Sequence, residues 1–196
     1  MARNDRPHLL AFLGNTGSRY ERTRHNAGWM LADELVPSAD SWQRKFKGVW
    51  LRTQIGDEQV VALKPQTMMN LSGESVQAAT RFFKWGADEV AVVHDDVEIA
   101  FGEVGVRFGG GLAGHNGLRS VAHCLGTRDF WRVRIGIGRP RHGELHGHVL
   151  GRFDRQEEAE LADILSAAGR LVRRGYSVGF SALQARIRAV DVEKSE

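Results

Sequence analysis

The most constraining feature of the sequence is a short apolar run, residues 90–93, that is followed by His94 and the acidic pair Asp95-Asp96. Consecutive apolar residues with polar groups at one end are typical of a strand that is buried on both faces. A second strand-like segment, residues 103–108, leads into a glycine-rich run, where backbone without Cβ atoms can approach a ligand closely. Because ligands in open α/β sheets bind beyond the carboxyl ends of strands, we expect a functional cleft around Asp95.

Strand and helix patterns alternate along the rest of the chain. Apolar runs and alternation predict strands over residues 8–13, 49–55, 59–63, 90–94, 103–108 and 130–138. Helical spacing predicts helices over residues 28–36, 70–83, 116–125 and 156–174, and a further helix to about residue 189. Residues 139–148 are expected to form a polar loop, a candidate lid. The pattern predicts an α/β fold, with one domain over residues 1–189 whose twisted mixed β-sheet has helices on both faces, and a polar tail over residues 190–196.

Composition sets further limits. A length of 196 residues with 42% hydrophobic and 26% charged residues fits one globular domain with a sizeable core. No apolar stretch approaches the length of a membrane span. The single cysteine, Cys124, allows no internal disulfide, so we expect a cytoplasmic protein. The formal net charge of +3 permits a nucleic-acid partner but does not require one.

Three motifs suggest other chemistry. The spacing of the glycines in residues 109–114 matches a dinucleotide-binding fingerprint, but the acidic residue expected about 20 residues later at a strand end is missing. His142, His146 and His148 could hold zinc, although a glycine-containing loop offers poor rigidity, and a solvated basic loop is the better interpretation. Cys124 lies in an apolar helical stretch, where a small buried hydrophobe is more common than a nucleophile.

Histidine, carboxylate and amide side chains in the predicted loops remain as candidates for catalysis. They are Asn15, His25, Asn26, Asn70, Asp95, Asp96, His115 and Asn116. Histidine can take a proton from water near neutral pH, a carboxylate beside it can fix its tautomer, and amides can polarise a carbonyl group. Because the same residue types often cap helices and turns, the pattern alone leaves a hydrolytic site as one alternative.

Five sequence blocks follow one another between residues 8 and 153. They are residues 13–28, which contain Thr23-Arg24-His25-Asn26; residues 64–73; residues 94–96 with 109–120; residues 130–140; and residues 148–153. In this order and spacing the chain resembles the bacterial peptidyl-tRNA hydrolase family. It departs from the family pattern at Thr16, where proline is usual, at Met68, where an aromatic residue is common, and at Gly105, where a basic residue is often found.

The resemblance implies an enzyme of translation that hydrolyses the ester between a peptide and the 3′ end of tRNA, without a metal or an organic cofactor. By the same resemblance, His25 is the general base, Asp95 orients it, and Asn15 positions substrate or water. The substrate-binding residues that it implies are Tyr20, Met69, Asn70, His115 and Asn116. It further implies a monomer that contacts the acceptor stem and 3′ end of tRNA.

Two arginines are candidates for a phosphate clamp on the RNA. Arg107 and Arg134 lie on predicted strands, and the guanidinium group matches phosphate geometry. Arg132 shares a strand face with Arg134, so we expect one of these two to pair with an acidic residue instead. A non-catalytic RNA-binding protein on the same scaffold is the main alternative function, and a nucleotide-binding oxidoreductase is a third.

Overall fold

The computed structural model describes residues 4–36, 41–140, 142–183 and 186–189, so the predicted tail over residues 190–196 lies outside the described part. Its strands form one mixed sheet in the order β2-β3-β4-β1-β5-β7-β6-β8. The strands are β1 (Leu9–Phe12), β2 (Gln43–Lys45), β3 (Gly48–Ile55), β4 (Glu58–Pro65), β5 (Val90–Asp96), β6 (Glu103–Phe108), β7 (Trp131–Gly136) and β8 (Arg186–Arg188).

The centre of the sheet is parallel and its two sides are antiparallel. β1 pairs in parallel with β4 and β5, and β5 pairs in parallel with β7. β3 and β4 form the predicted hairpin, while β6 runs antiparallel to β7. Since the parallel strands β4, β1 and β5 all end at the same edge, the loops that follow them meet there. The predicted mixed α/β sheet is confirmed.

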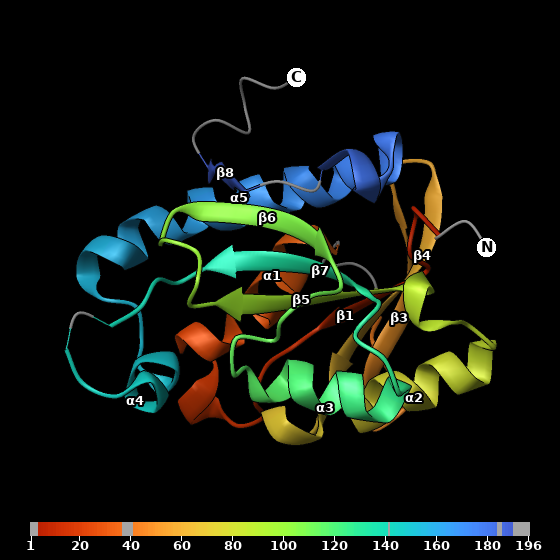
Figure 1. Ribbon diagram of the computed structural model, residues 1–196, viewed down its shortest axis with the longest axis horizontal. Helices are drawn as coiled ribbons and strands as arrows, with labels where there is room; N and C mark the ends of the chain where they lie inside the picture. The colour runs from red at the N-terminus through yellow and green to blue at the C-terminus, as the bar shows by residue number, and fades with distance from the viewer. Residues whose placement is uncertain (1–3, 37–40, 141, 184–185, 190–196) are drawn as a thin grey trace.

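Two helical layers cover the sheet. The helices are α1 (Ala27–Leu35), α2 (Ser72–Phe83), α3 (Asn116–Leu125), α4 (Leu145–Leu150) and α5 (Arg155–Val178). Alternate residues of β1 point to opposite layers: Leu10 and Phe12 share a core with residues of α1 and α5, whereas Leu9 and Ala11 share one with residues of α2 and α3. Figure 1 shows α5 along one side of the sheet and α2 with α3 along the other.

Two predictions of local structure were wrong, and one strand was missed. Residues 145–150, placed mostly in the polar loop, form helix α4. The helix expected to continue to residue 189 is replaced by a short 3₁₀ turn, Phe180–Leu183, and by β8, which pairs with β6. The edge strand β2 was not predicted, because three exposed polar residues carry no apolar alternation. In each case pairing or packing with distant residues decides the conformation of a short segment.

Helices α2 and α3 touch backbone to backbone at Gly73. A Cβ atom on Gly73 would lie 2.1 Å from the carbonyl oxygen of Ser120, and the Gly73 N–H donates to Ser120 Oγ at 2.9 Å. We therefore expect Gly73→Ala to lower the free energy of unfolding by roughly 3 kcal/mol, because the two helices must move apart. Chemical denaturation measures this change.

Gly147 in α4 provides the matched control, since a Cβ atom there would meet nothing within 4 Å. Gly147→Ala should leave the free energy of unfolding unchanged or raise it by up to about 1 kcal/mol, through helix propensity alone. Equal effects of the two substitutions would show that the close approach of α2 and α3 is not what Gly73 provides.

Candidate active site

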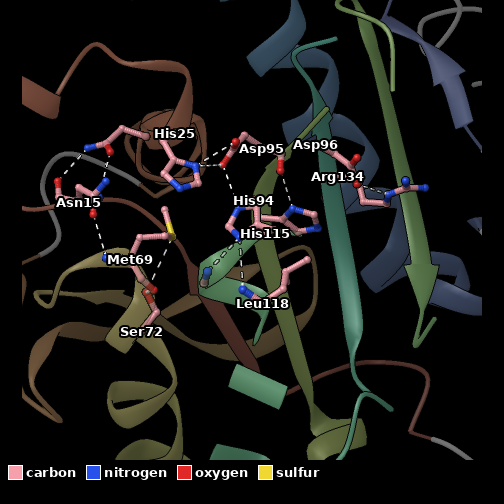
Figure 2. Close-up of polar contacts among 12 residues, drawn as sticks. Asn15, His25, Met69, Ser72, His94, Asp95, Asp96, His115, Leu118 and Arg134 are labelled. Atoms are coloured by element: carbon pink, nitrogen blue, oxygen red, sulfur yellow. Dashed lines mark hydrogen bonds and ion pairs between the residues drawn. The ribbon is translucent and has the colours of Figure 1, made fainter. Parts of the chain in front are cut away.

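The carboxyl edge of the parallel strands gathers the candidate catalytic residues (Figure 2). Asn15 follows β1, Met69 follows β4 in a 3₁₀ turn (Met69–Leu71), and Asp95 lies at the end of β5. His25 comes from another 3₁₀ turn, Arg24–Asn26, directly before α1. The adjacency of β4, β1 and β5 therefore brings together side chains that are far apart in the sequence.

His25 and Asp95 form a buried pair. His25 Nδ1 lies 2.9 Å from Oδ1 and 3.0 Å from Oδ2 of Asp95, and the two residues are 8% and 1% exposed. Because a carboxylate only accepts hydrogen bonds, Nδ1 carries the proton and Nε2 keeps its lone pair. His25 and Asp95 line a cavity of about 280 Å³ together with His115 and Asn116. The pair therefore presents a basic nitrogen whose tautomer is fixed by the carboxylate.

The electrostatics of the pair favour a protonatable imidazole. Burial lowers the pKa of His25, but the charge of Asp95 and the hydrogen bond to it raise the pKa by more, so that it lies above its usual value of 6.5. Burial likewise raises the pKa of Asp95, and the two neighbouring histidines lower it by more, to well below its usual range. Asp95 therefore stays ionised and stabilises a proton on His25.

His115 is a second partner of Asp95 and at the same time caps a helix. The N–H groups of Gly117 and Leu118 donate to His115 Nδ1, at 3.1 and 3.3 Å, which satisfies the first turn of α3. Since Nδ1 accepts these bonds, the ring proton is on Nε2, which donates to Asp95 Oδ1 at 3.0 Å. Asp95 is therefore held between two rings of fixed tautomer.

The same three residues are the one histidine–carboxylate group in the described ranges whose geometry could suit a metal ion. Their potential ligand atoms, from His25, Asp95 and His115, lie within 4.8 Å of one another. A metal ligand must offer a lone pair, but the helix cap leaves the proton of His115 on Nε2, the atom that faces the cluster. The protonation pattern therefore favours a hydrogen-bonded site over a metal site.

Asn15 is held by the backbone around it. Its Oδ1 accepts from the N–H of Met69 at 2.8 Å, and its own N–H donates to Asn26 Oδ1 at 2.9 Å. Asn26 Nδ2 in turn donates to the carbonyl oxygen of Asn15 at 3.0 Å. With Oδ1 occupied, the Asn15 amide has its Nδ2 donor left over, and in the described part of the chain this donor makes no hydrogen bond.

The other predicted substrate-binding residues are distributed unevenly. Asn116 is exposed and lines the cavity, and the buried Met69 adjoins the site through Asn15. Tyr20, in a 3₁₀ turn that precedes His25, and the exposed Asn70 do not line this cavity. Helix α4 also contributes to the cavity wall through Leu145 and Val149. The sequence predicts residues 139–148 as a candidate lid but does not single out these two side chains.

The arginines near the site differ in their partners. Arg134 Nε lies 2.8 Å from Asp96 Oδ2, with the Arg134 side chain 12% exposed, so this is the arginine that pairs with an acidic residue. Arg132 is 2% exposed and donates to the carbonyl oxygens of Gly109 and Gly111. Arg132 thus holds the backbone of the glycine run. The sequence pattern, a basic residue on an alternating strand, did not indicate this role. Arg107 is exposed.

The alternative motifs gain no support from the geometry. The glycine run lies between β6 and α3, and β6 is antiparallel to β7, whereas the dinucleotide fingerprint requires a parallel βαβ unit. His148 Nε2 is directed at the carbonyl oxygens of Ile137 and Gly138, at 3.2 and 3.1 Å. Burial, the largest influence on Cys124, raises the pKa of its thiol, which disfavours the thiolate.

His94 is a buried imidazole that the chemistry does not use. Its Nδ1 lies 2.7 Å from the Asp95 carbonyl oxygen, and its Nε2 has no partner in the described structure. Burial, followed by the neighbouring His115, lowers the pKa of His94 from 6.5 to about 3. His94 is therefore neutral in the folded protein at pH values where the unfolded chain binds a proton.

This difference predicts acid sensitivity. Since the unfolded chain takes up the proton below about pH 6.5 and the folded protein only near pH 3, His94 lowers stability as the pH falls through that window. The asparagine variant His94→Asn keeps a donor at the Nδ1 position and does not titrate. We expect its free energy of unfolding to fall less between pH 7 and pH 4, by up to roughly 3 kcal/mol, than that of the wild type in denaturant titrations. Parallel losses in both proteins would exclude His94 as the source.

No helix in the described ranges is both long enough and apolar enough to cross a membrane.

Comparison with known proteins identifies the family of this chain. The family model described as peptidyl-tRNA hydrolase matches residues 9–195. Among curated relatives, the peptidyl-tRNA hydrolase of Gluconobacter oxydans is 46% identical over 162 residues, covering 81% of this chain and 86% of the relative.

A second relative and a solved structure agree. The peptidyl-tRNA hydrolase of Sorangium cellulosum is 45% identical over 179 residues, covering 89% of this chain and 80% of the relative. The crystal structure of peptidyl-tRNA hydrolase from Acinetobacter baumannii superposes with a TM-score of 0.78 at 33% identity, covering 90% of this chain and 92% of that chain. These matches span the sheet and the site just described, and the chain belongs to the peptidyl-tRNA hydrolase family.

Proposed function

We propose that this protein hydrolyses the ester that joins a peptide to the 3′ end of tRNA, with water activated by His25. Membership of the family supports the reaction, and the Asp95-bound imidazole that lines the cavity is the observation that supports the mechanism. Further proposals from the same resemblance are a monomeric state and a cytoplasmic location.

In the proposed reaction, His25 Nε2 takes a proton from water while the water oxygen attacks the ester carbonyl carbon. The carbonyl oxygen becomes an oxyanion, for which the unpaired Nδ2 donor of Asn15 is a candidate partner. When the tetrahedral intermediate collapses, the bond to the ribose oxygen breaks and the imidazolium returns its proton to that oxygen. Asp95 stabilises the imidazolium and remains ionised throughout.

Two amide side chains, one in the cavity wall and one beside Met69, suggest how substrates are selected. Asn116 lines the cavity and Asn70 follows Met69, so both are candidates for hydrogen bonds to the peptide main chain. A free aminoacyl-tRNA has an ammonium group where a blocked substrate has an amide. With the free aminoacyl-tRNA, the polar groups that would bind the amide are left unpaired. The rate of hydrolysis of this substrate should therefore be much lower than that of the blocked substrate.

The reaction is tested with purified protein on N-acetyl-aminoacyl-tRNA beside the unblocked aminoacyl-tRNA. We expect kcat/KM for the blocked substrate to be at least about 10²-fold higher, because unsatisfied polar groups penalise the free ammonium. Binding of tRNA without release of the acyl group would instead support a non-catalytic RNA-binding protein.

For the RNA, we propose that Arg107 and Arg134 contact phosphates near the acceptor stem. The exposed side chain of Arg107 is available for such a contact. Arg134 pairs with Asp96 through Nε, so its contact with phosphate would use the terminal nitrogens of the guanidinium group. Arg107→Ala should weaken tRNA binding and reduce the slope of log Kd against log salt by about one. Titrations at several salt concentrations measure the slope, and an unchanged slope would remove Arg107 from the clamp.

A further inference from the structure

A cationic groove lies beside the turn between β2 and β3. It has a volume of about 530 Å³ and is lined by Arg44, Lys45, Lys47, Gly48, Val49 and Gln66. Lys47 pairs with Glu74 at 2.6 Å. Arg44 and Lys45 are exposed, and in the described ranges neither has a carboxylate partner. The groove therefore presents positive charge that the folded chain does not neutralise.

The turn that carries these cations packs against α2. Phe46 and Lys47 have φ values of 58° and 53°, a conformation that non-glycine residues adopt rarely and at a cost. Phe46 is 8% exposed and packs against Phe82, with ring centroids 5.3 Å apart, so its burial offsets this cost. Lys45 Nζ lies 3.5 Å from the centroid of the Phe82 ring, which keeps the ammonium group at the surface.

A short stretch of chain, residues 66–69, runs from the groove to the active site. The N–H of Gln66 donates to the carbonyl oxygen of Lys47 at 2.9 Å, and three residues later the N–H of Met69 donates to Asn15 Oδ1 at 2.8 Å. Three trans peptide units span at most about 11 Å between Cα atoms. An extended peptide covers roughly 3.5 Å per residue, so a peptide whose first residue lies beside Met69 would reach the groove at about its fourth residue.

The sheet order indicates which part of the substrate lies there. β6 and β7, which carry Arg107 and Arg134, lie on one side of β5, whereas the β2–β3 turn lies on the other, beyond β1 and β4. A peptidyl-tRNA has two arms that diverge from the ester bond. If the RNA arm runs over β6 and β7, the peptide arm runs toward the β2–β3 turn.

We propose that the groove beside the β2–β3 turn binds acidic side chains of the peptide, from about its fourth residue counted from the ester, and so gives the enzyme a charge preference among nascent peptides. This proposal rests on the proposed function. The preference would come from ion pairs between carboxylates of the peptide and the side chains of Arg44 and Lys45. Because both side chains are exposed to solvent, we expect each ion pair to contribute little to the binding energy.

The test uses two N-acetylated six-residue peptidyl-tRNAs that share the same tRNA and the same three residues next to the ester. The outer three residues are aspartates in one and lysines in the other. We expect wild-type kcat/KM to be roughly threefold to tenfold higher for the acidic peptide, from two exposed ion pairs. In Arg44→Glu the ratio should fall to about one or invert, because the groove loses one positive charge and gains a negative charge.

Arg52→Glu is the matched control, since Arg52 is an exposed arginine of β3 that does not line the groove. Its acidic-to-basic ratio should equal that of the wild type. A wild-type ratio of one, or equal changes in both variants, would overturn the groove assignment.

A third substrate, N-acetyl-aminoacyl-tRNA, tests whether the groove binds the peptide or the RNA of the substrate. Its single amino acid is too short to reach the groove. If Arg44→Glu slows its hydrolysis as much as that of the acidic peptide, and flattens the salt dependence, the groove binds RNA phosphates instead. Absence of hydrolysis of every substrate by the wild type would refute the proposed function, whereas hydrolysis without a charge preference refutes the groove proposal alone.

Discussion

Replacing His25 by alanine is expected to lower kcat for N-acetyl-aminoacyl-tRNA by about 10³-fold, within the range that general-base catalysis supplies. Two imidazoles, His25 and His115, line the cavity and bind Asp95. His115 uses both ring nitrogens, one to accept from the first turn of α3 and one to donate to Asp95, whereas His25 keeps a lone pair on Nε2. Single-turnover measurements, which isolate chemistry from product release, provide the rate constant.

His123→Ala is the matched control, because His123 is an exposed histidine of α3 that lies outside the cavity. Its rate constant should remain within about twofold of the wild type, as for most surface substitutions. A rate in His25→Ala that equals that of His123→Ala would mean that another group activates the water.

The second large effect is expected for Asp95→Asn, with a loss of about 10³- to 10⁴-fold in kcat/KM. Asp95 accepts hydrogen bonds from His25 Nδ1 and from His115 Nε2. The asparagine amide has one oxygen, and its NH₂ group would face a ring N–H or force His25 into the opposite tautomer. The basic nitrogen would then no longer face the cavity.

The pH profile separates this effect from a loss of folding. Activity requires neutral His25, so wild-type kcat/KM should rise with pH through the raised pKa of that residue. In Asp95→Asn, burial still lowers the pKa of His25 while the carboxylate that raises it is gone. The residual activity should therefore have its acidic limb shifted to lower pH, measured between about pH 5 and pH 9. An acidic limb at the wild-type position would show that Asp95 does not set this pKa.

The strand that carries Asp95 could be predicted from sequence, because a buried strand has a strong local pattern. The partnership of His25 with Asp95 could not, since it depends on β1 lying between β4 and β5. The two residues are 70 positions apart in the sequence, and no local sequence pattern indicates that they are close in space. The resemblance to a family implied that Asp95 orients His25, and the structure adds that the two side chains are in direct contact.

His115 illustrates a different limit of the sequence. The usual helix caps are short side chains such as serine, threonine, aspartate and asparagine. A histidine that accepts from the first turn of α3 while donating to Asp95 has no sequence signature. The resemblance implied that His115 binds substrate, which stays a prediction, and its hydrogen bonds show in addition that it holds Asp95. At the C-terminal end, β8 is three residues long and owes its conformation to pairing with β6, which local periodicity does not report.

The backbone contact between α2 and α3 has a consequence for the entropy of substrate binding. Asn70 lies in the 3₁₀ turn that leads into α2, and Asn116 is the first residue of α3. Because Gly73 lets the two helices pack in contact at Ser120, we expect the folded structure to set the spacing of the two amides. A peptide held between them would lose its own freedom on binding, while the protein would lose little, so more of the contact energy remains available to orient the ester.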